Sequence, residues 1–243
     1  MIERFYCPGS SVDGLASLEG DEARHLIRVR RIEVGEEVEL FDGRGTAFRA
    51  KVVELGRDRA SLEILGVVRN GLGLGMSLTL ATAVPKGERF DWLVEKATEL
   101  GLSRLIPIIT ARSSVDPRTS KIDRLRRVVI EASKQCRRDL LMDLDPPTPW
   151  AAQIGRDASS TRLIAHPGGP GLLTPGLIPA NRPIVVAIGP EGGFDEVEVG
   201  KALAAGWLAV GLGETILRVE TAAIAACSTV MAIFDARRSG EGD

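Results

Sequence analysis

The chain has 243 residues, of which 44% are hydrophobic, 26% are charged and 4% are aromatic, with a formal net charge of −2. This composition is typical of a globular protein with one large or two small domains. The low aromatic content disfavours recognition of RNA by an aromatic stacking surface, and the net charge does not by itself identify a nucleic-acid-binding protein. The three cysteines lie far apart in the sequence, which excludes a CxxC metal site and disfavours a disulfide framework, so no metal is expected.

The sequence also lacks the usual signals for export or membrane insertion. Its first ten residues contain no apolar run long enough for a signal peptide, and no stretch approaches 18 uncharged apolar residues. We therefore expect a protein of the reducing cytoplasm that does not span a membrane.

The first 70 or so residues have the pattern of a small β-barrel of the size of an RNA-binding module. Short segments rich in Val, Ile and Leu predict strands at 38–41, 47–53 and 60–64, and acidic residues at the start of 21–29 predict a helix there. The glycine-rich stretch 70–75 predicts a linker, which gives an N-terminal domain at 1–72 and a C-terminal domain at 73–243. Its GxGxG spelling precedes a strand, which is the wrong context for a dinucleotide site.

After residue 77, strand and helix patterns alternate. Strands are predicted at 77–84, 104–110, 162–165, 183–188 and 207–211, and helices at 88–100, 120–138, 195–205 and 219–237. This alternation predicts an α/β fold, a mostly parallel sheet with helices on both faces. Ligands bind such sheets at the carboxyl ends of the strands, which directs attention to the loops after Ile188 and Gly211. The Pro/Gly-rich segments 144–150 and 167–179 are predicted to be surface connections.

The loop Ile188–Asp195 contains three glycines, which let the backbone approach a ligand closely. A tight strand-to-helix turn would explain the same glycines, and Asp195 and Glu198 have the spacing of a capping box. A phosphate-binding loop would carry Gly-Lys-Ser or Gly-Lys-Thr here, whereas this loop carries Glu191, which repels phosphate. The loop therefore favours a ligand without phosphate, and a cationic one fits best.

The segment Leu212–Ala223 contains the loop that joins a strand end to an alanine-rich helix. Ile216 and Leu217 are apolar loop residues that would line a pocket for a flat ring, with backbone groups recognising the ring's edge. An ordinary buried C-terminal helix is the alternative interpretation of the same segment.

Together these two loops resemble the paired signatures IGPEGG(F/W)xxxE and LGxxILRxETA of the bacterial E-type 16S ribosomal RNA uridine-N3 methyltransferases, in the SPOUT superfamily. Four further segments are similar to that family's motifs and cover most of the chain in the same order: His25–Arg31, Lys86–Gly101, Arg112–Ser113 and Lys134–Arg138. One departure is Cys136, which stands where the family usually has Ser and is a weaker hydrogen-bond donor.

The resemblance implies a SPOUT trefoil-knot methyltransferase domain, a rare exception to the absence of knots, preceded by a PUA-like β-barrel. It implies S-adenosylmethionine as cofactor, a homodimer with active sites at the subunit interface, and N3 of a specific uridine in 16S ribosomal RNA as the methylated atom. The substrate expected is the assembled or nearly assembled 30S subunit.

Residues for each role follow from the two loops and the resemblance. The cofactor-binding residues predicted are His166, Ile188, Gly189, Pro190, Glu191, Gly192, Leu212, Gly213, Ile216, Leu217, Thr221 and Ala222. Arg218 is predicted to stabilise the imide anion that forms as N3 of uridine loses its proton. Glu220 or a water molecule is predicted to accept that proton.

RNA-binding residues are predicted from local charge. In the segment 120–138, an apolar stripe and a basic stripe are offset by two residues, about 200° around a helix, so the basic face is expected to point outward. From Arg112 to Arg138 there are nine Lys or Arg against three Asp or Glu, although most such runs are only solvated helix faces. The predicted set is Arg24, Arg28, Arg30, Arg112, Arg124, Arg127, Lys134, Arg137 and Arg138.

Two other functions remain open on the sequence. One is a SPOUT methyltransferase that acts on transfer RNA. The other is an RNA-binding protein without catalysis, which a measurement of S-adenosylmethionine binding would separate from an enzyme.

Overall fold

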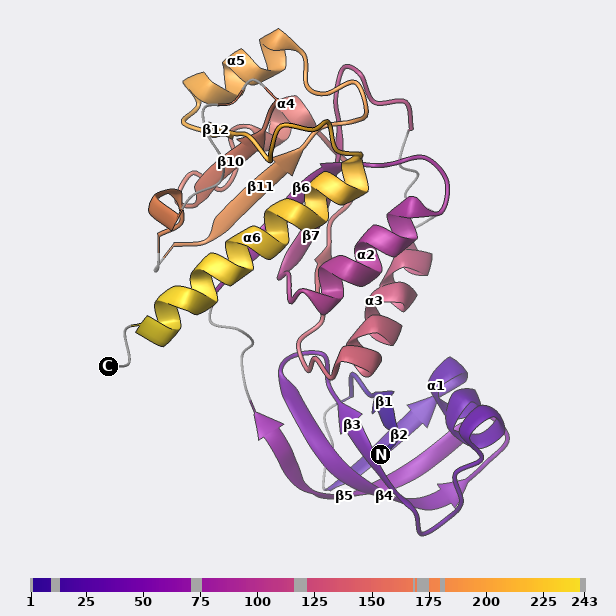
Figure 1. Ribbon diagram of the computed structural model, residues 1–243. Helices are drawn as coiled ribbons and strands as arrows, with labels where there is room; N and C mark the ends of the chain where they lie inside the picture. Colours follow the sequence, from indigo (N-terminus) through magenta and orange to yellow (C-terminus); the bar gives the residue numbers. More distant parts are fainter. Residues whose placement is uncertain are drawn as a thin grey trace. The chain divides into compact units, whose positions relative to one another are not determined.

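The computed structural model describes residues 2–9, 14–70, 76–115, 122–167, 169, 175–179 and 182–240, and the chain divides into two compact units (Figure 1). One unit comprises Met1–Gly73 and Ser133–Leu141, and the other comprises Leu74–Ala132 and Met142–Asp243. The sequence places 133–141 in the second domain, whereas in the structure this segment groups with the first unit. The domain boundary proposed between residues 72 and 73 lies outside the described residues.

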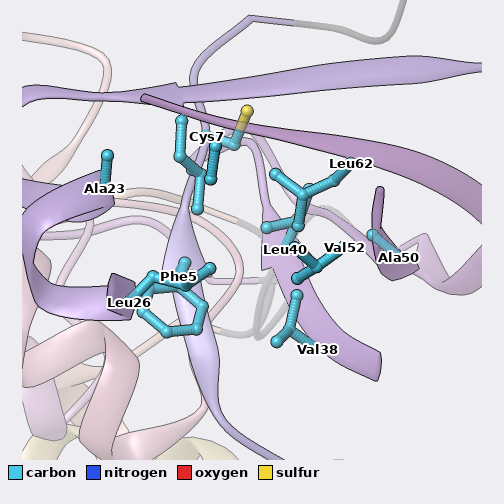
Figure 2. Close-up of a cluster of buried hydrophobic side chains, with 11 residues drawn as sticks. Phe5, Cys7, Ala23, Leu26, Val38, Leu40, Ala50, Val52 and Leu62 are labelled. Atoms are coloured by element: carbon cyan, nitrogen blue, oxygen red, sulfur yellow. The ribbon is translucent and has the colours of Figure 1, made fainter. Parts of the chain in front are cut away.

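The N-terminal unit is built on a five-stranded sheet with the order β1-β3-β4-β5-β2. The strands are β1 (Arg4–Tyr6), β2 (Leu15–Glu19), β3 (Glu37–Phe41), β4 (Thr46–Leu55) and β5 (Arg59–Asn70). The three predicted strands are present as β3, β4 and β5, while the shorter edge strands β1 and β2 are additional. Figure 2 shows the core they enclose, in which the side chains of Phe5, Leu26, Leu40 and Leu62 are buried together.

The predicted helix over 21–29 is present in two parts. It begins as α1 (Gly20–Arg24) and continues as a π-helix at His25–Arg30. Arg31 ends it with a φ of 54°, a left-handed conformation that stops helical hydrogen bonding.

The segment Ser133–Leu141 is held in the N-terminal unit by a cluster of buried charges. Arg4 forms ion pairs with Glu39 (3.0 Å) and Asp139 and donates a hydrogen bond to the Ser133 carbonyl oxygen (2.9 Å). Arg69 binds the same two carboxylates, at 2.5 Å to Glu39 and 2.9 Å to Asp139. Hydrogen bonds to both carboxylates raise the pKa of Arg69, so this cluster stays charged.

The second unit contains the predicted parallel sheet, with the order β12-β10-β11-β6-β7-β8 and with β9 also paired to β7. Every strand pair in it is parallel. The strands are β6 (Leu78–Ala83), β7 (Arg104–Ile109), β8 (Asp143–Leu144), β9 (Thr148–Pro149), β10 (Thr161–Ala165), β11 (Ile184–Ile188) and β12 (Leu208–Val210).

Helices cover both faces of this sheet, as predicted. On one face α2 (Arg89–Glu99) packs against α6 (Val219–Gly240), which lies across β6 and β11 (Figure 1). On the other face, residues of α4 (Trp150–Gln153) and α5 (Glu196–Ala204) form a core with Ile106, Ile164 and Val185. By length and composition α6 could also cross a membrane, but its packing against α2, β6 and β11 is that of a core helix.

The segment 144–150 is not simply a surface connection. It contains β9 and the end of β8, and Trp150 is buried with its ring 4.8 Å from that of Phe194 and 5.0 Å from that of Trp207. Proline residues around these short strands hid them from a pattern-based prediction. The other predicted connection, 167–179, lies partly outside the described residues, and its described part includes the buried Ile178.

Candidate active site

A pocket lies at the carboxyl edge of the parallel sheet, where the loops after β10, β11 and β12 meet. Its volume is about 160 Å³. It is lined by Ala165, His166, Pro167, Ile188, Gly189, Pro190, Glu191, Gly193, Leu212, Gly213, Glu214, Thr215, Ile216, Leu217, Val219 and Ala222. The two loops selected from the sequence therefore converge on one site, because the carboxyl ends of parallel strands lie on the same edge.

The loop after β11 is fixed at both of its ends. Phe194 is 4% exposed and packs on Trp150, which anchors the loop in the core. Asp195 and Glu198 form the predicted capping box at the start of α5. At Gly189 a Cβ atom would lie 3.0 Å from the Phe194 ring and from its amide nitrogen, so a side chain there would displace the loop.

The loop after β7 is hydrogen-bonded to the loop after β11 and to the start of α5. The Ala111 N–H donates to Glu198 Oε1 (2.8 Å), and Arg112 Nη1 donates to the Gly192 carbonyl oxygen (2.7 Å). Glu198 Oε2 accepts from the Asp195 N–H (3.0 Å), so one carboxylate connects two strand-end loops.

The structure brings together all of the predicted cofactor-binding residues except Gly192 and Thr221, which do not line the pocket. A Cβ atom at Gly192 would meet only the Arg112 side chain, at 3.4 Å, so Gly192 is less crowded by the protein than Gly189. Thr221 is exposed on the first turn of α6.

The pocket suits an apolar ring attached to a cation and does not suit a phosphate. Ile188, Leu212 and Leu217 form apolar walls, and Glu191 and Glu214 add carboxylates. Among the described residues that line it there is no Lys or Arg. S-adenosylmethionine has an adenine ring, a sulfonium and no phosphate, and therefore fits this set of residues.

The two predicted catalytic residues lie in different environments beside this pocket. Arg218 is exposed and does not line it. Glu220, on the first turn of α6, is 9% exposed, and its Oε2 atom has no hydrogen-bond partner among the described residues. Among the described residues Glu220 forms an ion pair with Arg89, whose Nε lies 3.7 Å from Glu220 Oε1.

No cysteine in this unit is suited to act as a nucleophile. Cys227 is fully buried on α6, and desolvation raises the pKa of its thiol to about 12. In the N-terminal unit, burial likewise raises the pKa of Cys7.

Only some of the predicted RNA-binding residues are exposed cations without an acidic partner in the described part of the chain. The apolar stripe of α3 (Ile122–Cys136) is buried at Ile122, Leu125, Val129 and Ala132, as predicted. Arg127 and Arg137 are exposed, Arg138 is half-buried, and Arg124 is exposed but paired with Asp91. Three other exposed arginines also form ion pairs, Arg24 with Asp21, Arg28 with Asp58 and Arg30 with Glu3, whereas the exposed Arg112 donates to the Gly192 carbonyl oxygen.

The outward orientation predicted for Lys134 is wrong. Its side chain is 9% exposed, its Nζ lies 2.9 Å from Glu22 Oε1, and it approaches the Phe5 ring. A lysine in this position stabilises the N-terminal unit, and the helical periodicity alone could not reveal that a carboxylate 112 positions earlier in the chain would meet it.

Sequence reasoning also missed two residues beside the pocket. Arg89 and Glu198 each belong to a recognised motif, but no role was assigned to Arg89, and only capping was assigned to Glu198. Their partners, Glu220 and Ala111, are distant in sequence, so spacing gave no signal.

Comparisons with known proteins match both units. Residues 74–231 match the model of an RNA methyltransferase domain, and residues 18–65 match that of an RNA methyltransferase PUA domain. The chain is 31% identical to the ribosomal RNA small subunit methyltransferase E of Synechocystis sp., over 94% of this chain and 76% of that protein. The chain belongs to the ribosomal RNA small subunit methyltransferase E family.

Solved structures of this family and its relatives share the fold. The methyltransferase E of Neisseria gonorrhoeae, bound to S-adenosyl methionine, is 31% identical with a TM-score of 0.88, covering 96% of this chain and 98% of that one. A methyltransferase from Legionella pneumophila, also with the bound cofactor, is 30% identical with a TM-score of 0.87 over 96% of this chain and 98% of that one. The α/β fold with a PUA-like domain, predicted from the resemblance, is thus confirmed.

Proposed function

We propose that this chain transfers a methyl group from S-adenosylmethionine to N3 of a specific uridine in 16S ribosomal RNA. The observation that carries the proposal is the phosphate-incompatible, apolar pocket at the strand ends, in a chain that belongs to the methyltransferase E family. The cofactor, when bound, supplies a methyl group already activated by its sulfonium, so the protein's main contribution is to position two reactants.

The chain's own residues account for that positioning. The walls of Ile188, Leu212 and Leu217 hold the adenine ring, while Gly189 and Gly193 keep the loop backbone close to it. The carboxylates of Glu191 and Glu214 favour the positive charge of the ligand. His166, whose backbone N–H donates to the Val210 carbonyl oxygen at 3.0 Å, forms the wall on the β10 side.

A homodimer with the active site at the subunit interface is part of the proposal, as is the knotted path of the chain. Ile216 supports the dimer, because it lines the pocket and yet is 90% exposed in the single chain. Val197 and Leu203 on α5 are also exposed apolar residues, at 61% and 45%. A second copy that covers such residues would close the pocket, which sedimentation measurements of the isolated protein would detect as a dimer.

The substrate proposed is the assembled or nearly assembled 30S subunit in the cytoplasm. The test is mass spectrometry of 16S ribosomal RNA from cells with and without the gene for this protein. We expect one N3-methyluridine to disappear and to return when purified protein and S-adenosylmethionine are added to the mutant 30S subunits. Loss of a methyl group from transfer RNA, with ribosomal RNA unchanged, would support the alternative substrate instead.

A further inference from the structure

Glu220 and Arg89 form an unusual ion pair at the surface beside the pocket. The Glu220 side chain is 12% exposed and one of its oxygens, Oε2, is buried without a hydrogen-bond partner among the described residues. The Arg89 side chain is 45% exposed, and its Nε lies 3.7 Å from the other carboxylate oxygen, Oε1, beyond hydrogen-bond distance. The pair is therefore loose, and among the described residues no hydrogen bond to the Arg89 guanidinium or to Glu220 Oε2 accompanies it.

The pair has a defined place relative to the cofactor pocket. Glu220 lies between Val219 and Ala222, both of which line the pocket. Arg89 begins α2, shortly after the carboxyl end of β6, and β6 is the neighbour of β11 in the sheet. Along the sheet edge, the pocket occupies the ends of β12, β10 and β11, and the pair follows on the β6 side.

The chemistry of the pair matches one edge of uracil. That edge presents an N3–H donor between two carbonyl acceptors. A carboxylate accepts a hydrogen bond from N–H, and a guanidinium donates to a carbonyl oxygen with its planar set of N–H groups. Cytosine has an acceptor at N3, so it would place a lone pair against the Glu220 carboxylate where uracil places a donor.

We propose that the Arg89–Glu220 pair binds the imide edge of the target uridine, with Glu220 as the general base for N3 and Arg89 on the adjacent carbonyl oxygen. This assignment rests on the proposed function and names the residues that select uridine. The N3 proton moves to the Glu220 carboxylate, and the electron pair left on N3 forms the bond to the methyl carbon. The electron pair of the broken carbon–sulfur bond stays on sulfur, which becomes neutral as Glu220 becomes protonated.

Arg89 contributes its positive charge, which stabilises the negative charge that develops on the base. As N3 loses its proton, negative charge spreads to the carbonyl oxygens, and a guanidinium beside one of them stabilises it. The base must leave its stack to reach this site, as in other enzymes that act on a base. An exposed arginine next to a buried carboxylate is suited to receive such a base from solvent.

The test is the pH dependence of single-turnover methylation of 30S subunits from cells lacking this protein, with Glu220→Gln. Glutamine keeps the size of the side chain but cannot accept the proton. The rate at neutral pH should fall about 100-fold or more, and the deficit should narrow as pH rises, because hydroxide then removes the N3 proton. Cofactor affinity, measured by calorimetry, and the melting temperature should stay close to those of the unmodified protein.

Glu196→Gln is the matched control, since Glu196 is an exposed acid on the first turn of α5. It should leave the rate and its pH dependence unchanged. A Glu220→Gln deficit that is constant with pH, or that follows a loss of melting temperature and cofactor affinity, would assign Glu220 to structure and overturn the proposal. So would a Glu220→Gln protein with the normal rate.

Arg89→Met allows a second test, which measures binding of 30S subunits instead of turnover and changes an exposed residue instead of a buried one. Without cofactor, the unmodified protein should bind unmethylated 30S subunits better than methylated ones, because methylation removes the N3–H. Arg89→Met should lose most of that preference, while Arg182→Met, at an exposed arginine near the start of β11, should keep it. An Arg89→Met protein with the full preference would overturn the assignment. Failure of the unmodified protein to methylate 30S subunits would instead overturn the proposed function.

Discussion

The helices α5 and α6 both begin at the carboxyl edge of the parallel sheet, and their first turns use carboxylates in opposite ways. At α5, Glu198 accepts hydrogen bonds from the N–H groups of Asp195 and Ala111, and Asp195 accepts one from the Glu198 N–H (2.7 Å). At α6, Glu220 is buried with one oxygen unsatisfied among the described residues. The first arrangement fixes loops, whereas the second leaves a carboxylate without a full set of partners among the described residues.

The energetic contrast explains why this difference is informative. A buried polar atom without a partner costs roughly 1–3 kcal/mol of stability, whereas a satisfied capping box stabilises a helix. A protein that keeps the unsatisfied group gives up stability at that position, which is typical of residues that serve function. The comparison therefore supports the proposals that the α5 side holds a pocket loop in place and that Glu220 on the α6 side accepts the proton.

The largest expected effect on the α5 side comes from Gly189→Val. The added side chain would clash with Phe194 and move the loop that forms the pocket wall. We expect cofactor affinity to fall about 100-fold, or about 2.8 kcal/mol, as measured by calorimetry. Gly192→Val is the control, because a Cβ there meets only the Arg112 side chain, and its affinity should stay within about threefold. Equal losses in both variants would mean that the whole loop, and not Gly189, approaches the cofactor.

A smaller effect is expected from Glu198→Ala, which removes the capping box and the hydrogen bond from Ala111. The melting temperature should fall by about 2–6 °C, which corresponds to about 1–1.5 kcal/mol for a chain of this size. Cofactor affinity should weaken roughly 3- to 10-fold, since the two loops lose their connection. The pH dependence of methylation should keep its slope, and a changed slope would break the distinction drawn between Glu198 and Glu220.

On α3 the same comparison separates a cation that is paired within the protein from one that is exposed to solvent. Arg127 is exposed, whereas Lys134 is buried against Glu22. Arg127→Ala should reduce the slope of log affinity for 16S ribosomal RNA against log salt by about one unit. Lys134→Met should leave that slope unchanged and lower the melting temperature. A normal slope in Arg127→Ala would show that this face of α3 is only solvated.

The sequence predicted the elements of this fold better than the contacts between them. The strands β6, β7, β10 and β11 and the two pocket loops followed from hydrophobic patterns and glycine positions, because those signals are local. The orientation of Lys134 and the pairing of Arg89 with Glu220 could not be predicted, since their partners are set by tertiary packing. The same holds for β1, which is only three residues long and is defined by its parallel pairing with β3.

The smallest effect expected is that of Arg218→Lys, and it decides between two arginines. The sequence favours Arg218 as the group that stabilises the imide anion, because it belongs to the cofactor loop. In the structure its side chain is exposed and does not line the pocket, whereas Arg89 lies beside the unsatisfied carboxylate. Lysine keeps the charge but loses the planar set of donors, so the variant affects whichever arginine acts on the base. We expect Arg89→Lys to lower the single-turnover rate by about 10-fold or more and Arg218→Lys by less than about threefold, with cofactor affinity unchanged in both. The reverse order of effects would return the role to Arg218 and would place the uridine against the loop after β12 instead of the end of β6.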